Sequence, residues 1–281
     1  MATQTQTTVE LEPIDHQEGD KSRPRVPSIV LASPANTTSG QSVPLTGFEI
    51  DEPVSYTLPR NRYIIVIIQL AGVNFITSFS NGLVTVGLPA MSNGLDLSAG
   101  LLLWPMNSYA LTSASCLLLA GAVADVIGTR KVNLVGCFFI ALFILMSGFS
   151  RTGIQLIIFR ALQGIAGAMA LPSALSIISR SVPSGKPRNV GFACLGLAMP
   201  LGFSFGMVLA GVFIDGPGWR AGFYMGGAAS FLLFIVGIWA LPIDIKVRTE
   251  ISVRQRLMME VDWFGAGLAS ASIALFSYVL A

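Results

Sequence analysis

From Tyr63 onward the chain alternates long apolar stretches with short polar ones. The apolar stretches cover 63–89, 100–122, 132–149, 154–178, 190–213 and 222–241. Each is close to the roughly 20 residues that cross the hydrocarbon layer as a helix. A further stretch runs from Phe264 to Ala281, which is near the shortest length that can cross. The pattern therefore predicts an all-α polytopic membrane protein with six complete spans and the start of a seventh helix.

The segments flanking these spans have a different character. Residues 1–60 contain no long apolar run and are rich in Thr, Ser, Pro and acidic side chains, so they cannot bury enough apolar surface to fold alone. Residues 242–262 are polar and charged by comparison with the spans. The predicted organisation is a disordered tail over 1–60, a six-helix bundle over 61–241, a linker over 242–262 and a partial seventh helix over 263–281.

The basic residues predict an orientation in the membrane. If the N-terminus is cytoplasmic, only Arg151 and Arg220 of the 17 Lys and Arg residues lie on the outer side. Arg160 lies within a span, and all the others are cytoplasmic. Such an excess of Lys and Arg is typical of cytoplasmic loops. We therefore expect an integral, multi-pass protein of the plasma membrane with its N-terminus and its 242–262 linker in the cytoplasm.

The amino-acid composition agrees with a membrane protein and limits the kinds of functional site to be expected. Hydrophobic residues make up 53% of the chain and charged residues 11%, with a mean hydropathy of +0.69, whereas soluble domains carry about 25% charged residues. Cys116, Cys137 and Cys194 fall in apolar runs without metal-ligand spacing, and the single histidine, His16, lies in the tail. We expect no metal, no cofactor, no catalytic activity and no nucleic-acid partner.

A Gly-rich segment with charged residues connects the second and third spans. It reads Gly121-Ala-Val-Ala-Asp125-Val-Ile-Gly128-Thr-Arg130-Lys131. Glycines allow close backbone approach in a short hairpin, and a carboxylate can cap a helix N-terminus. The plainer interpretation is a solvated acid beside the basic residues that any cytoplasmic hairpin attracts.

Arg160 is the single charged residue of the fourth apolar stretch. An arginine at membrane depth is costly, so it usually marks a pathway or a switch. Gln163 lies one turn away on the same side, which predicts a hydrogen-bonded cluster beside a cavity. The alternative is a long side chain that reaches outward to the membrane interface.

The first span carries a polar stripe, formed by Asn74, Thr77, Ser78, Asn81 and Thr85. Their spacing places them on one helical face, which should meet a water-filled cavity or another helix. Interhelical hydrogen bonding alone is the simpler interpretation. None of the six spans contains Asp, Glu, His or Lys, so no carboxylate in them can carry a coupling proton.

Small residues mark helix contacts. Gly202 and Gly206 have the Gly-x-x-x-Gly spacing that lets two helices approach closely, and we expect Gly164 and Gly167 to pack against a neighbour in the same way.

Taken together and in this order, these segments resemble signatures of the major facilitator superfamily. The 121–131 segment is similar to the family's loop signature, although Val126 and Thr129 stand where members usually carry basic residues. The run 156–167 around Arg160 is similar to the fourth-helix signature, and the glycines of the fifth span resemble the antiporter signature. The runs 101–109, 218–220 and 261–265 resemble the fungal fourteen-helix drug:proton antiporter branch.

The resemblance implies a mechanism as well as a fold. In the family, two six-helix bundles rock about a central site. The resemblance implies that Asp125 stabilises the outward-facing state through a helix end and a basic residue across the halves, and that Arg160 with Gln163 senses protonation. It also implies efflux of drugs or toxic metabolites by proton antiport. The second bundle is then a missing C-terminal half or a partner chain.

Two alternatives to drug efflux remain open. The first is a transporter of a small nutrient or of ammonium. The second is a non-transporting half-protein that assembles with a full-length partner.

Overall fold

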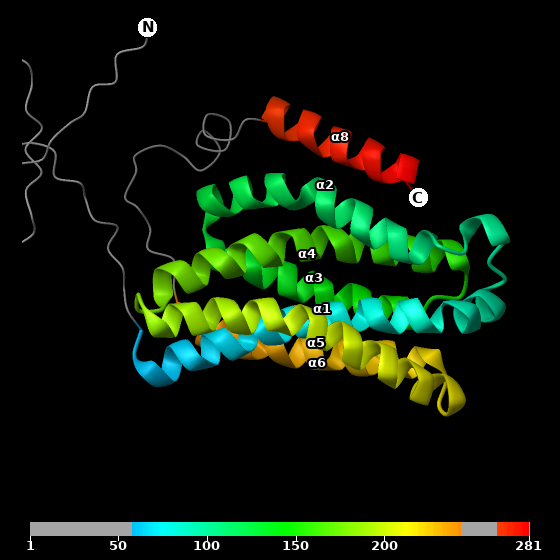
Figure 1. Cartoon of the computed structure of the whole chain (residues 1–281), viewed down its shortest axis with the longest axis horizontal. Helices are drawn as coiled ribbons and strands as arrows, with labels where there is room; N and C mark the ends of the chain where they lie inside the picture. Colours follow the sequence, from blue (N-terminus) through cyan, green and yellow to red (C-terminus); the bar gives the residue numbers. More distant parts are fainter. Residues whose placement is uncertain (1–57, 243–262, 281) are drawn as a thin grey trace, which may run out of the picture. The chain divides into compact units, whose positions relative to one another are not determined.

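The computed structural model describes residues 58–242 and 263–280, and within these ranges the chain is built from helices. The bundle consists of α1 (Arg60–Leu95), α2 (Trp104–Ile127), α3 (Thr129–Gly148), α4 (Gly153–Ser181), α5 (Lys186–Asp215) and α6 (Trp219–Ala240) (Figure 1). All six are long and apolar enough to cross a membrane. A short 3₁₀ turn, Ala99–Leu101, precedes α2, and a further helix, α8, covers Trp263–Leu280. The predicted all-α membrane bundle is confirmed. The tail and the 242–262 linker lie almost wholly outside the described residues.

The first helix is longer than its apolar stretch. α1 continues past Pro89 for more than a turn, because transmembrane helices tolerate an internal proline when neighbouring groups satisfy the freed carbonyl. Asp96 caps its C-terminus in the left-handed conformation, with φ 49°, and donates its N–H to the Ser92 carbonyl. The following helix, α2, starts with Pro105 in its first turn, where a missing N–H costs nothing.

The second and third helices are joined by one residue. Gly128 has φ 113° and ψ 130°, a backbone that L-residues with a Cβ rarely adopt, and it separates the last residue of α2 from the first of α3. Asp125 therefore lies in the last turn of α2, while Arg130 and Lys131 lie in the first turn of α3. The apolar pattern suggested a longer hairpin here, because it shows where the hydrophobic stretch ends and not where the helix ends.

α1 lies at the centre of the bundle and contacts every other bundle helix. Its most extensive contact is with α5, and α2 packs mainly on α4. α3 lies between α4 and α6, and α8 lies along α2 (Figure 1). This arrangement brings residues of α1, α2 and α4 together although they are far apart in sequence.

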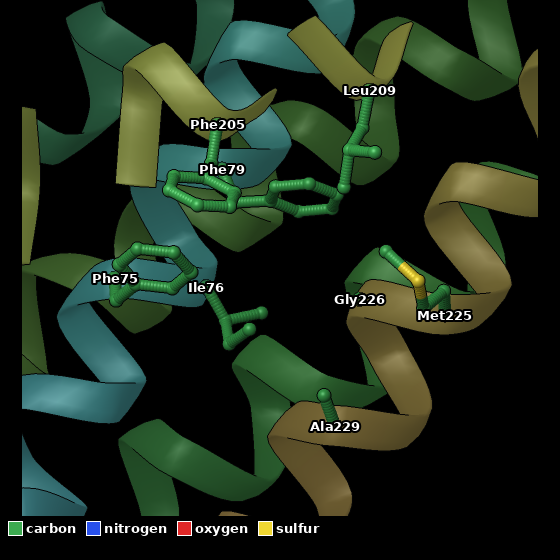
Figure 2. Close-up of a pocket in the computed structure, with 8 residues that line it drawn as sticks. All are labelled: Phe75, Ile76, Phe79, Phe205, Leu209, Met225, Gly226 and Ala229. Carbon is green, nitrogen blue, oxygen red and sulfur yellow. The ribbon is translucent and has the colours of Figure 1, made fainter. Parts of the chain in front are cut away.

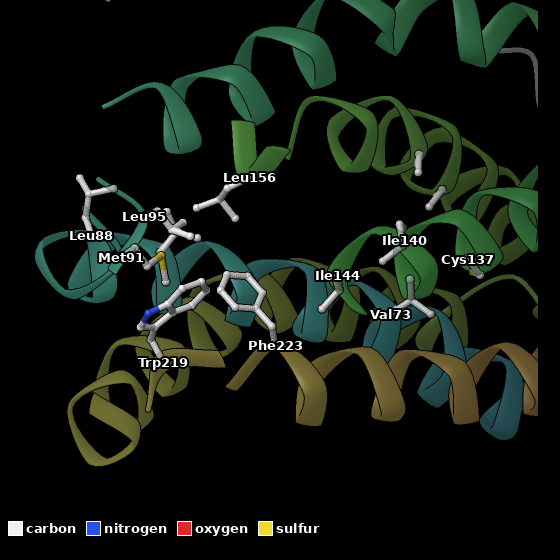
Figure 3. Close-up of a cluster of buried hydrophobic side chains, with 13 residues drawn as sticks. Val73, Leu88, Met91, Leu95, Cys137, Ile140, Ile144, Leu156, Trp219 and Phe223 are labelled. Carbon is white, nitrogen blue, oxygen red and sulfur yellow. The ribbon is translucent and has the colours of Figure 1, made fainter. Parts of the chain in front are cut away.

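One hydrophobic cluster extends from the end of the bundle that carries the α1–α2, α3–α4 and α5–α6 connections past the middle of the helices (Figure 3). Met91 and Leu95 of α1 meet Leu156 of α4 there, and Trp219 contacts Phe223 edge-on with ring centroids 6.0 Å apart. Other large apolar side chains remain exposed on the outside of the bundle, including Val208, Leu232 and Trp239. An apolar exterior of this kind matches the hydrocarbon of a bilayer.

Candidate functional site

Arg160 lies at the junction of α1, α2 and α4 with its side chain fully buried. Its Nη1 donates to the Ser80 hydroxyl at 3.0 Å and to the Gln163 Oε1 at 2.9 Å. Nη2 donates to the Asn81 Oδ1, and Nε donates to the Pro105 carbonyl at 3.2 Å. We call this set the Arg160 cage. The structure thus brings Arg160, Gln163 and Asn81 together, and the guanidinium does not reach outward to an interface.

An aromatic ring covers the guanidinium. The Tyr109 ring centroid lies 4.9 Å from the Arg160 Cζ, a distance that allows a cation–π contact. Two glycines of α4 make room for this arrangement. A Cβ on Gly164 would meet Thr112 and the α2 backbone, and a Cβ on Gly167 would lie 3.2 Å from the Tyr109 hydroxyl. Both glycines face α2, and Gly167 also accommodates the ring over Arg160.

Three of the groups that contact Arg160 were not anticipated from the sequence: the Ser80 hydroxyl, the Pro105 carbonyl and the Tyr109 ring. Ser80 falls outside the regular spacing of the polar stripe, yet its side chain is fully buried against Arg160. Pro105 and Tyr109 fall within the 101–109 run, whose pattern does not indicate a contact with Arg160. A long arginine side chain can reach two adjacent positions of a neighbouring helix. The consecutive polar residues Ser80 and Asn81 are therefore the sequence feature that could have indicated a contact with Arg160.

The rest of the polar stripe of α1 bonds mainly to its own helix. Asn74 donates to the Leu70 carbonyl at 3.0 Å and Thr77 to the Val73 carbonyl at 2.8 Å. Thr85 donates to the Asn81 carbonyl at 2.9 Å. Ser78 is buried, with 5% of its surface exposed. Short polar side chains in an apolar medium often satisfy themselves in this way, so of the stripe only Asn81 reaches the cage.

The α2–α3 hairpin makes contacts within the same bundle. The Asp125 carboxylate lies 3.5 Å from the guanidinium of Arg180, in the last turn of α4, with both side chains about two-thirds exposed. An exposed pair of this kind is worth about 0–1 kcal/mol. Arg130 donates to the Ile238 carbonyl at 2.8 Å, near the C-terminal end of α6, where a cation is favoured by the helix dipole. Lys131 is exposed, and Gly121 packs loosely beside Pro172.

The α1–α5 contact depends on glycine. A Cβ on Gly202 would overlap the Phe75 carbonyl, and one on Gly206 would overlap the Phe79 carbonyl. The fit is reciprocal, because a Cβ on Gly82 of α1 would overlap the Phe203 carbonyl of α5. Gly202 and Gly206 are therefore close-packing positions.

A second buried polar chain links α1, α3 and α4. The Gln69 amide donates to Cys137 Sγ at 3.8 Å, and Cys137 donates to the Asn133 Oδ1 at 3.5 Å. Asn133 donates in turn to the Ser173 hydroxyl at 3.0 Å and to the Ala170 carbonyl at 3.1 Å. The sequence marked Cys137 only as a small core residue, and nothing in its spacing indicated these partners.

A small apolar cavity of about 100 Å³ lies between α1, α5 and α6 (Figure 2). Phe75 and Phe205 border it with ring centroids 5.9 Å apart, and Met225 faces it from α6. Its lining contains no charged side chain, so it lacks the chemistry of the Arg160 cage.

Comparison with known proteins places the chain in a family. Residues 70–280 match the family model described as Major Facilitator Superfamily. The chain belongs to the major facilitator superfamily. It is therefore an integral, multi-pass membrane protein of a family of small-molecule transporters.

Several curated members of the superfamily are similar in sequence. MFS-type transporter 1 of Pyricularia oryzae is 36% identical over 79% of this chain. The low affinity ammonium transporter of Saccharomyces cerevisiae is 30% identical over 64%, and the multidrug transporter mdr3 of Aspergillus fumigatus is 28% identical over 62%. The matched stretches cover 40%, 35% and 33% of these relatives' own lengths, so the chain spans well under half of each.

Proposed function

We propose that this chain supplies one bundle of a secondary transporter that exports drugs or toxic metabolites by proton antiport. The observation that supports it most is the Arg160 cage, a fully buried cation held at the junction of α1, α2 and α4. Buried ionisable residues in a membrane bundle mark substrate or ion pathways. Relatives named for multidrug transport and for aminotriazole resistance favour efflux over uptake.

The proposed cycle is alternating access between two bundles about this site. Arg160 and Gln163 then sense protonation indirectly, because an arginine in a protein does not lose its own proton. In this cycle Asp125 stabilises the outward-facing state, and its ion pair with Arg180 links the α2–α3 hairpin to the end of α4. We place the protein in the plasma membrane with its N-terminus in the cytoplasm.

Efflux can be tested in cells that express the protein from its own gene and in matched cells that lack the gene. Cells lacking it should accumulate more of at least one member of a panel of chemically diverse toxic compounds. A protonophore should abolish the difference if the coupling ion is the proton. Equal accumulation of every compound would contradict efflux.

The same assay tests the switch role of Asp125. Asp125→Asn should slow efflux while protein abundance stays near normal, because the change removes the charge and keeps the shape. Asp215→Asn is the matched control, since this exposed acid lies at the opposite end of the bundle, in the last turn of α5. Equal efflux in the two variants would show that Asp125 is an ordinary solvated acid with no role in the switch.

Ammonium transport is the second candidate, favoured by the similarity to the ammonium transporter. Uptake of labelled methylammonium separates the two functions. A gene-dependent methylammonium flux without any gene-dependent efflux would select ammonium transport.

Alternating access requires two bundles that move about a shared central site, and a single bundle cannot provide this movement. We therefore expect the purified 281-residue chain in liposomes to show no saturable flux of any compound that the cells export. Saturable, Arg160-dependent flux by the purified chain would instead indicate that two copies assemble into a transporter, and it would contradict the idea of a non-transporting half.

A further inference from the structure

Within the residues that the structure describes, the Arg160 cage holds a cation without an anion. Its hydrogen-bond partners are a hydroxyl, two amide oxygens and a backbone carbonyl, all of them uncharged. The acidic residues of the described bundle, Asp96, Asp125 and Asp215, lie at helix ends. A buried charge is normally paired, because leaving it alone in a medium of low dielectric constant is costly. The cage therefore carries uncompensated positive charge.

The cage also has more hydrogen-bond donors than acceptors. The guanidinium has five N–H groups, and the structure shows four hydrogen bonds from it. The Gln163 Oε1 accepts from Arg160, which fixes the orientation of the amide and directs its NH₂ group elsewhere. That nitrogen is buried and has no hydrogen-bond partner among the described residues. Surplus donors beside a positive charge suit a group that only accepts, and a carboxylate is such a group.

We propose that the Arg160 cage binds the carboxylate of an anionic small molecule. This inference rests on the proposed transport function and names its substrate class. A cation at this position would be repelled, whereas an anion would neutralise Arg160 and accept from the free donors. Asn81 and Tyr109, which contact the guanidinium, are half-buried, so the proposal requires the carboxylate to reach Arg160 from their side. An acidic side chain from a protein segment outside the described helices offers the same chemistry, so the experiments below also separate these two sources.

Three probes of nearly equal shape test the charge preference directly. Benzoate, benzamide and benzamidinium carry one negative, no and one positive charge on the same ring. Binding of each labelled probe is measured on the purified chain in lipid nanodiscs. Benzoate should bind saturably, benzamide should bind about tenfold to a hundredfold more weakly, as expected for loss of a charged hydrogen-bond partner, and benzamidinium should not bind. Equal or tighter binding of benzamidinium overturns the proposal, and so does a lack of benzoate binding.

Two variants locate the binding at the cage. Gln163→Glu places a carboxylate where the Oε1 now accepts from Arg160, so it should fill the site internally and abolish benzoate binding in a folded protein. Arg160→Gln should weaken benzoate binding about tenfold to a hundredfold. Arg220→Gln is the matched control, because Arg220 contacts Trp219 and the Ser150 carbonyl at one end of the bundle and should leave binding unchanged.

Folding of each variant is checked by size-exclusion chromatography and circular dichroism. If Arg160→Gln fails to fold, the three probes on the wild-type chain and the Gln163→Glu variant still test whether the cage binds a carboxylate. Wild-type benzoate affinity in folded Gln163→Glu overturns the proposal.

Flux measurements in cells that express the protein from its own gene distinguish the source of the carboxylate. Gene-dependent, saturable benzoate flux assigns the anion to the substrate. Binding by the purified chain without such flux supports the anion site and overturns its assignment to the transported substrate. Failure of the transport proposal is recognised separately, as a lack of gene-dependent flux for every compound while benzoate binding persists.

Discussion

Arg160 is stabilised by oxygen acceptors that come from three helices, so its environment depends on the exact position of each neighbour. Ser80 is the most informative of these acceptors. Its hydroxyl is fully buried and lies 3.0 Å from the Arg160 Nη1. Removing it leaves one N–H of the buried guanidinium without its partner, and an unsatisfied buried donor costs more than the hydrogen bond itself contributed.

Ser80→Ala should therefore lower the free energy of unfolding by about 1–3 kcal/mol. Unfolding of the purified chain is followed by circular dichroism during a titration with sodium dodecyl sulfate. Ser204→Ala serves as the control, because the exposed Ser204 hydroxyl donates only to the Pro200 carbonyl of its own helix and its loss should have little effect. Equal stability of the two variants would mean that Ser80 contributes nothing to holding Arg160.

Prediction from sequence was uneven at this scale. Arg160 and Gln163 were identified because a charge in an apolar stretch and an amide one turn away are both visible in the chain. Tyr109 could not be assigned to them, since its contact depends on how closely α2 approaches α4. That approach depends in turn on two glycines whose partners the sequence does not name.

At the scale of helices, the most extensive contact in the bundle is the reciprocal one between α1 and α5. Gly202 and Gly206 lie against the backbone of α1, and Gly82 lies against the backbone of α5. Helices in a membrane gain little from hydrophobic burial, so close van der Waals packing of this kind has to hold them together. An added methyl group at such a contact meets backbone atoms, which cannot move aside as a flexible side chain can.

Gly206→Ala should consequently destabilise the bundle by about 1–3 kcal/mol through overpacking. Gly211→Ala in the same helix is the matched control. A Cβ there meets nothing within 4 Å, so alanine should be neutral or stabilise by roughly 0.5–1 kcal/mol through its helix propensity. Both are measured by the same detergent titration, and a Gly206→Ala protein as stable as Gly211→Ala would show that α1 and α5 are not closely packed.

In the α2–α3 hairpin, a single residue determines whether the charged residues of the motif lie in a loop or in helices. Gly128 reverses the chain by itself, so Asp125 and Arg130 belong to helix ends instead of a flexible loop. Asp125 then meets Arg180 of α4, while Arg130 meets the end of α6. The motif was recognisable from sequence, but its partners within the bundle were not, because they are more than fifty residues away along the chain.

At the scale of the whole molecule, the membrane orientation follows from the distribution of Lys and Arg and remains a prediction. Six antiparallel crossings place the α4–α5 connection, 182–185, on the same side as the N-terminus and the α5–α6 connection, 216–218, on the opposite side. With a cytoplasmic N-terminus, the first connection is inside the cell and the second is outside.

Cysteine labelling tests this orientation. In intact cells, a membrane-impermeant thiol reagent should label Pro217→Cys and leave Ser184→Cys unlabelled, after subtraction of the signal from the native cysteines. Both positions are exposed, so accessibility does not bias the comparison. Permeabilised cells provide the control, in which both variants should react. The reverse labelling pattern in intact cells would invert the topology.

The sequence by itself determined the class of protein, the number of complete spans and the family. These follow from local properties: stretch length against the thickness of a bilayer, the lack of charge within the stretches, and motifs whose spacing is read directly. It also identified Arg160 as the exceptional residue. Only the tertiary structure decided that Ser80, Pro105 and Tyr109 surround it, and that most of the polar stripe of α1 bonds to its own backbone. The physical reason is that such contacts depend on the separation and rotation of packed helices. Glycines allow two helices to approach closely, but the separation also depends on the residues that face each glycine, and the sequence does not identify those residues.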